Sequence, residues 1–284
     1  CMKQRGKKGE SCRNFAIKPN GILVTANSAP TPRLTLLDGG SYTFVGAVGF
    51  PILRKLENAR NISMSVKYLR DDKGFGCRFC AVLDGAQDIF GSIWHHNQSY
   101  RALVSLGAFI PGWTLICPLK HTCNLLDHYE RSDFWKFASE SSSVISSRYG
   151  KCAIFEHGTR TEMSATGCGV GHAHAHLVPL AFALEDEARR VVPEWEWRNC
   201  LATEVKSAVK GEEYLFVATQ FNGRATKGSL CILKEPTSQF FRRVIADKCG
   251  IGEMYDYKKY PMIEVASRSA DQLRESASKL YVSA

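Results

Sequence analysis

Three histidines stand at alternating positions in GHAHAHLVPL, residues 171–180. They are His172, His174 and His176, in a chain of 284 residues with eight histidines. Imidazole can ligate a metal, attack an electrophile or carry a proton near neutral pH. On a β-strand, alternate side chains share one face and lie about 7 Å apart. We expect such a strand here, and the pattern alone leaves metal binding and catalysis both open.

A second group of candidate ligands lies upstream. CRFC places Cys77 and Cys80 at the CxxC spacing that forms one edge of a tetrahedral zinc site. PGWTLICPLKH places His121 directly after an expected strand, where a fixed backbone can present a ligand. Two thiolates and two imidazoles would complete a closed structural site. A catalytic metal held by all three alternating histidines fits less well, because same-face side chains on one strand are nearly parallel and do not converge.

The sequence patterns around these residues predict three regions. A basic, β-rich extension covers 1–72, a core covers 73–182, and an α/β region covers 183–284. The core has strand patterns on both sides of a helical stretch at 122–150, with a break expected near 131–133. Strands are expected at 21–27, 42–48, 62–69, 92–96, 100–106, 113–118, 152–157, 172–180, 213–220 and 229–234. Antiparallel strands interrupted by one long helical connection predict an α+β fold.

Charge is concentrated at the start of the chain. The net charge is +9, and residues 1–70 hold 12 Lys and Arg against 3 Asp and Glu, whereas residues 71–284 hold 25 of each. The basic region could guide a nucleic acid to the core, or it could be a solvated terminus. The eleven cysteines, with no apolar run of about 18 residues and no secretory leader pattern, favour a cytoplasmic protein with reduced thiols and no membrane contact.

Residues 76–180 resemble the histidine triad (HIT) superfamily of nucleotide hydrolases and nucleotidyltransferases. The segments CRFC, PGWTLICPLKH, FEHG and GCGVGHAHAHLVP follow the order found in that family. The resemblance implies a HIT-like antiparallel sheet with a long connecting helix. It also implies a nucleotide or nucleotide conjugate as substrate, and it leaves a homodimer open.

The resemblance assigns roles to individual residues. It makes His174 the nucleophile that attacks the α-phosphate, and it makes His176 the group that contacts the phosphate and the leaving group. It implies a structural zinc bound by Cys77, Cys80, His121 and His172. Histidine at 176 is typical of the hydrolases, whereas transferases tend to have glutamine there.

Two segments depart from the family pattern. His157 in FEHG stands where relatives often have an asparagine that orients the nucleophile or contacts phosphate. The segment between FEHG and the triad is longer than usual. Its Gly167 and Gly169 are nevertheless suited to a close approach of backbone to phosphate oxygens. His157, Gly167, Gly169 and His176 are therefore the expected phosphate-binding residues.

The leading hypothesis is thus a hydrolase or transferase that cleaves at the α-phosphate through a nucleotidyl-histidine on His174. One alternative is an enzyme that processes nucleic-acid ends or caps, as deadenylases and decapping enzymes do, with the basic region guiding the polymer. Another is a non-catalytic nucleotide- or RNA-binding module. The intact triad disfavours the last alternative, because binding alone needs no nucleophile between two further histidines.

Overall fold

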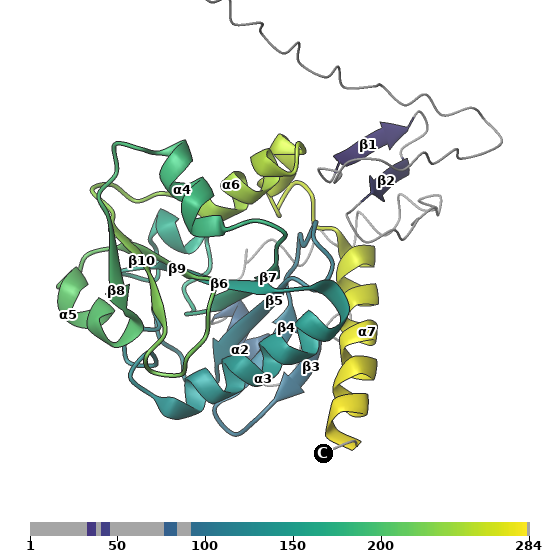
Figure 1. Cartoon of the computed structure of the whole chain (residues 1–284), viewed down its shortest axis with the longest axis horizontal. Coiled ribbons are helices and arrows are strands. Elements are labelled where there is room, and N and C mark those ends of the chain that lie inside the picture. Colours follow the sequence, from purple (N-terminus) through teal and green to yellow (C-terminus); the bar gives the residue numbers. More distant parts are fainter. Residues whose placement is uncertain (1–32, 38–40, 46–76, 84–91, 283–284) are drawn as a thin grey trace, which may run out of the picture.

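The computed structural model describes residues 33–37, 41–45, 77–83 and 92–282 (Figure 1). The strands expected at 21–27 and 62–69, and nearly all of the basic extension, lie outside the described residues. Within the extension, β1 (Arg33–Leu37) and β2 (Ser41–Val45) form an antiparallel pair with Leu37 opposite Ser41. The second of these strands is one that the sequence predicts.

The remaining strands build one eight-stranded sheet in which every neighbouring pair is antiparallel. The strands are β3 (Ile93–His96), β4 (Tyr100–Val104), β5 (Thr114–Pro118), β6 (Cys152–Gly158), β7 (Ala175–Pro179), β8 (Trp197–Leu201), β9 (Tyr214–Ala218) and β10 (Lys227–Ile232). Their order across the sheet is β3-β4-β5-β7-β6-β9-β10-β8. The predicted mixed architecture with an antiparallel sheet is confirmed, and the strands from 183–284 continue the sheet begun by 73–182.

Helices lie on both sides of this sheet (Figure 1). They are α2 (Arg78–Leu83), α3 (Ser132–Tyr149), α4 (Leu184–Val191), α5 (Val205–Val209), α6 (Phe240–Lys248) and α7 (Ile263–Val282). Helix α3 packs on one face over β4, β6 and β7, and α7 packs along α3 and the strands β3 and β4. On the other face, Phe241 of α6 contacts Phe155 of β6, with their ring centroids 4.7 Å apart. Among the described helices, none is long and apolar enough to cross a bilayer.

Two elements are shorter than the sequence predicts. Helix α3 begins at Ser132, whereas the residues before it form turns in which the N–H groups of His128 and Tyr129 bond to the carbonyl of Leu125. These turns replace about the first third of the expected helical stretch, and α3 begins at the break expected near 131–133.

The strand expected at 172–180 begins only at Ala175. His172 and His174 therefore precede the strand, and the prediction that all three histidines share one strand face is wrong. The cause is local hydrogen bonding. The N–H of Ala173 bonds to the carbonyl of Thr122, and the carbonyl of His172 accepts a bond from the His174 ring. These backbone groups are thus unavailable to a neighbouring strand.

One end of the sheet brings the motifs together. His176 of β7 pairs with Leu115 of β5 and with Phe155 of β6, which is the last pair in the register between β6 and β7. On the side of β6 that faces away from β7, His157 pairs with Leu215 near the start of β9. The loops that carry the other motif residues leave the sheet at this end.

Candidate functional site

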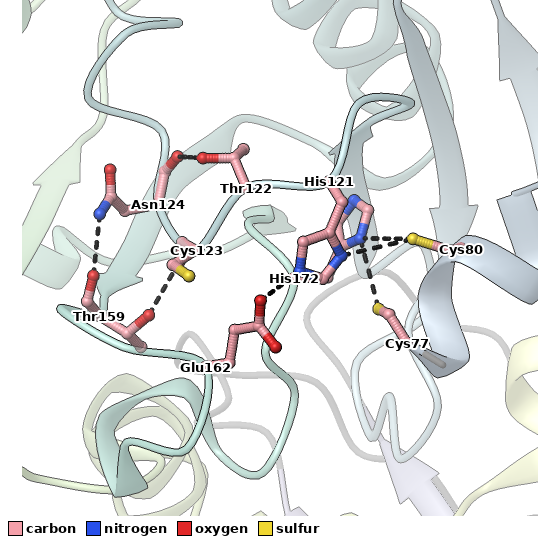
Figure 2. Close-up of polar contacts among 9 residues, drawn as sticks. All are labelled: Cys77, Cys80, His121, Thr122, Cys123, Asn124, Thr159, Glu162 and His172. Carbon is pink, nitrogen blue, oxygen red and sulfur yellow. Dashed lines mark hydrogen bonds and ion pairs between the residues drawn. The ribbon is translucent and has the colours of Figure 1, made fainter. Parts of the chain in front are cut away.

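Four residues from three separate segments form a compact group of metal-ligating atoms (Figure 2). Cys77 and Cys80 stand at the start of α2, His121 follows β5, and His172 precedes β7. Their ligand atoms all lie within 4.8 Å of one another. The structure thus brings together the set that the sequence predicts, and this set could hold a metal ion.

The separations of the ligand atoms are compatible with zinc. Nδ1 of His172 lies 3.5 Å from Sγ of both Cys77 and Cys80, and Nδ1 of His121 lies 3.4 Å from Sγ of Cys80. A tetrahedral zinc ion, with bonds of about 2.3 Å to sulfur and about 2.0 Å to nitrogen, would hold such atoms about 3.5 Å apart. These three separations are therefore compatible with zinc, and all four ligand atoms lie within 4.8 Å of one another.

The outer nitrogens of both histidines fix the tautomers that a metal needs. Nε2 of His172 lies 2.8 Å from the carbonyl oxygen of Pro118, and Nε2 of His121 lies 3.0 Å from a carboxylate oxygen of Glu162. Because these oxygens only accept, each Nε2 must carry the proton. Both Nδ1 lone pairs are then directed at the thiols. Burial also lowers the pKa of His172, which favours the neutral ring that binds metal.

Hydrogen bonds between loops hold Glu162 in reach of His121 (Figure 2). Asn124 donates through Nδ2 to the carbonyl of Thr159 at 2.8 Å, and Thr159 donates through Oγ1 to the carbonyl of Cys123 at 2.9 Å. The loop after β5 is therefore joined to the loop after β6. A carboxylate behind a metal-bound histidine orients its ring, and Glu162 occupies that position here.

His174 is the most accessible histidine of the triad, since it is half-buried whereas His172 and His176 are buried. Its Nδ1 lies 2.8 Å from the carbonyl oxygen of His172 and donates to it. The neutral ring therefore leaves Nε2 unprotonated, as a nucleophile requires. Phe79, which stands between the two cysteines of CRFC, lies with its ring edge toward His174 at a centroid distance of 5.4 Å.

His176 has the opposite tautomer. Its Nδ1 accepts a 2.9 Å hydrogen bond from Nε1 of Trp113, so the neutral ring carries its proton on Nε2. Burial, and then the nearby charges of His174, His157 and Arg242, hold the pKa of His176 well below its ordinary value. His176 is thus a neutral hydrogen-bond donor, 4.9 Å from His174 between ring centroids.

His157 lies behind the triad. Its ring centroid is 5.8 Å from that of His176, and its Nε2 accepts the backbone N–H of Phe241 at 3.2 Å. Burial lowers its pKa to about 3, with smaller contributions from His174, Arg242 and Arg243, so the ring is neutral with its proton on Nδ1. The side chain is 7% exposed, and among the described residues Nδ1 has no hydrogen-bond partner.

The expected glycine loop lies between β6 and the triad. A β-carbon on Gly167 would stand 2.8 Å from Cγ2 of Thr159, so glycine permits that close packing. Gly169 has φ +78°, a left-handed conformation that favours glycine, and a β-carbon there would lie 3.1 Å from Nζ of Lys258. The contribution of these glycines to phosphate binding stays a prediction.

Several residues at the site carried no signal in the sequence. Glu162 is a carboxylate in a loop, Trp113 is a tryptophan at the start of a strand, and Arg242 is one arginine of a helix. None of the three stands at a spacing that is diagnostic of a functional site. Phe79 lies inside CRFC, so its contact with His174 could have been suggested once that motif was assigned to the metal.

The chain matches no protein-family model and no curated protein. Part of it is similar to the solved structure of a Hit-like protein involved in cell-cycle regulation from Bartonella henselae, with 17% identity and a TM-score of 0.31 over 37% of this chain and 76% of that chain. It is also similar to the protein SMU.412c from Streptococcus mutans UA159, with 20% identity and a TM-score of 0.32 over 44% of this chain and 88% of that chain. At these identities and TM-scores, neither similarity indicates a function for this chain.

Proposed function

We propose that this protein is a HIT-type nucleotide hydrolase or nucleotidyltransferase, with His174 as its nucleophile. The observation that carries the proposal is the pair of opposite tautomers. His174 has its proton on Nδ1 and His176 has its proton on Nε2, because each ring meets a partner of fixed donor or acceptor type. A base beside a neutral N–H donor is the arrangement that nucleophilic attack on a phosphate ester needs.

The chemistry follows in two steps. Nε2 of His174 attacks the α-phosphorus of a nucleoside phosphate derivative, so that an N–P bond forms while the bond from phosphorus to the leaving group breaks. The leaving group departs with that electron pair and takes a proton from solvent. His176 donates a hydrogen bond to the oxygens on which negative charge develops. Water, or another acceptor in a transferase, then attacks phosphorus and releases a proton to solvent, the N–P bond breaks with its electron pair returning to Nε2, and His174 is regenerated.

A structural zinc at Cys77, Cys80, His121 and His172 would support this site from one side. When bound, the ion supplies four bonds that fix α2, the loop after β5 and the segment before β7 to one another. His172 then presents its carbonyl to Nδ1 of His174 from a fixed position. The nucleophile depends on the ligand cluster through this carbonyl and through Phe79.

A substrate panel with product analysis by mass spectrometry tests the proposal. It contains a nucleoside phosphoramidate, a dinucleoside polyphosphate, and capped and 5′-adenylated oligonucleotides. We expect turnover of at least one member and a histidine-linked nucleoside monophosphate on the peptide that contains His174. His174→Ala should abolish turnover and the adduct while nucleotide still binds.

A matched control is His96→Ala, since His96 is an exposed histidine at the end of β3. It should leave both readouts unchanged. Full turnover by His174→Ala, or an adduct on a different residue, would overturn the proposal. An oligonucleotide as the only productive substrate would instead select the end-processing enzyme. Direct contacts of phosphate with His157, Gly167 and Gly169 are part of the proposal, to be tested by substitution at each.

A further inference from the structure

Helix α6 lies against the rear of the histidine site, although it begins 64 residues after His176 in the chain. The segment from 237 to 257 is attached to the residues around the triad by four hydrogen bonds. These run from N–H of Thr237 to Oγ1 of Thr166 at 3.0 Å, from N–H of Gln239 to Sγ of Cys168 at 3.2 Å, from N–H of Phe241 to Nε2 of His157 at 3.2 Å, and from the hydroxyl of Tyr257 to the carbonyl of Cys168 at 2.9 Å.

Arg242 is a charged side chain of α6 that is buried in this interface. It is 3% exposed, and its guanidinium donates to the carbonyl of Gly107 at 2.5 Å and to that of Tyr255 at 2.7 Å. No ion pair to Arg242 occurs among the described residues. A buried charge satisfied only by carbonyls costs stability, so its position calls for an explanation.

The explanation lies in what the guanidinium covers. Its central carbon lies 4.7 Å from the centroid of the Trp113 ring, within the range of a cation–π contact. The same indole donates from Nε1 to Nδ1 of His176 at 2.9 Å. A cation over the ring face draws electron density from the indole and makes its N–H a stronger donor. The charge of Arg242 also opposes protonation of His176 and His157.

The backbone of α6 acts on the second buried histidine. Because the N–H of Phe241 can only donate, Nε2 of His157 must accept, and the proton of that ring is confined to Nδ1. The contact that sets the tautomer of His157 thus begins on α6, and the indole that sets the tautomer of His176 lies under a guanidinium of α6.

We propose that α6 is a positioning element of the active site, in which Arg242 holds Trp113 so that His176 keeps its proton on Nε2, while the N–H of Phe241 fixes the tautomer of His157. The catalytic role of His176 in this statement rests on the function proposed above, whereas the tautomers themselves do not. Arg242 and Trp113 are positioning residues, because each acts on the reaction through His176.

Nitrogen-15 NMR of histidine-labelled full-length protein measures the tautomers directly and needs no substrate. In the wild type we expect His176 and His157 to be neutral at pH 7, with protons on Nε2 and on Nδ1 respectively. A wild-type His176 with its proton on Nδ1, or a charged His176, would overturn the proposal without any variant having to fold.

Two variants then test the mechanism. Trp113→Phe removes the donor with a small change in volume, and Arg242→Met removes the charge. In both, His176 should populate the Nδ1–H tautomer, more fully in Trp113→Phe, while His174 keeps its own tautomer. Trp135→Phe is the matched control, since Trp135 is also fully buried but donates to the carbonyl of Tyr129 on the other side of β6. It should leave the spectrum of His176 unchanged.

Turnover separates this inference from the function on which it rests. Once a substrate is known, Trp113→Phe should lower kcat about tenfold or more with little change in KM, because the donor that sets His176 is missing in the transition state. Arg242→Lys, which keeps the charge, should recover part of the loss seen in Arg242→Met. If the wild type has the expected tautomers but turns over no substrate, the proposed function is overturned while the role of α6 stands. Turnover by the wild type together with an unaltered His176 spectrum in Arg242→Met would remove the role of α6 alone.

Discussion

Glu162 is predicted to strengthen metal binding although it does not ligate the metal. Its carboxylate lies 3.0 Å from Nε2 of His121, the nitrogen opposite the one that faces Cys80. When Nδ1 binds a cation, the Nε2–H becomes more positive and its bond to the carboxylate becomes stronger. Glu162→Gln keeps an acceptor of similar size and removes only the charge.

The structure bounds the size of this effect. The side chains of His121 and Glu162 are 30% and 61% exposed, so the pair lies in surroundings close to water. Two unit charges 3.0 Å apart in water interact by about 1.4 kcal/mol, which corresponds to about tenfold in affinity. The charge transferred to the ring is less than one unit, which reduces the interaction below this figure in surroundings of that permittivity. We expect Glu162→Gln to weaken zinc binding by about three- to tenfold.

Competition of the purified protein with a chromophoric zinc chelator measures this affinity. Glu212→Gln is the control, since Glu212 is exposed, and no ion pair to it occurs in the described part of the chain. Salt should reduce the difference between wild type and Glu162→Gln, because the pair is solvated. Equal zinc affinities of the wild type and Glu162→Gln at low salt would contradict a role for this carboxylate in metal binding, and a zinc-free native protein would contradict the metal site.

Two further predictions concern stability. Gly171→Ala would place a β-carbon 2.8 Å from Cβ of Glu162 and 2.9 Å from its carbonyl oxygen. We therefore expect a loss of about 1–3 kcal/mol in the free energy of unfolding, together with weaker zinc binding. Gly252→Ala is the control, because the atom nearest to its added β-carbon is an ordinary 3.5 Å away. Burial raises the pKa of Glu156 to about 7 from an ordinary 4.5. The unfolded chain therefore loses this proton first, and stability should fall by on the order of 3 kcal/mol between about pH 4.5 and 7. Denaturant titrations of Glu156→Gln should lack that component, and parallel pH curves for the two proteins would contradict the assignment.

The metal cluster could be predicted from sequence because its ligands are chemically specific. The CxxC cysteines and a histidine after a strand indicate three donors, the resemblance to the HIT superfamily implies His172 as the fourth, and the structure brings Cys77, Cys80, His121 and His172 together. The α+β architecture was also accessible, since alternating apolar residues mark most strands of the sheet. These features depend on local patterns that a single segment can carry.

The parts that could not be predicted depend on contacts between distant segments. The triad pattern suggests a strand through His172 and His174, but the N–H of Ala173 bonds to the carbonyl of Thr122 and the carbonyl of His172 accepts from the His174 ring instead. The bond from Trp113 to His176 spans 63 positions, and the carbonyls that Arg242 meets are 135 and 13 positions away. The periodic patterns of residue types along a sequence do not indicate such pairs, because each pair depends on how the folded sheet positions its loops.

The order of the strands determines how the chain can be shortened. Strand β6 lies between β7 and β9, and all seven of its residues are buried. A chain ending near residue 182 would keep every histidine of the triad and would lose β9. The backbone N–H and C=O groups of β6 would then form an open sheet edge beside an apolar surface, which is a template for pairing with another chain. Self-association of β6 edges, more than any missing catalytic group, would thus limit a shortened protein confined to the histidine motifs.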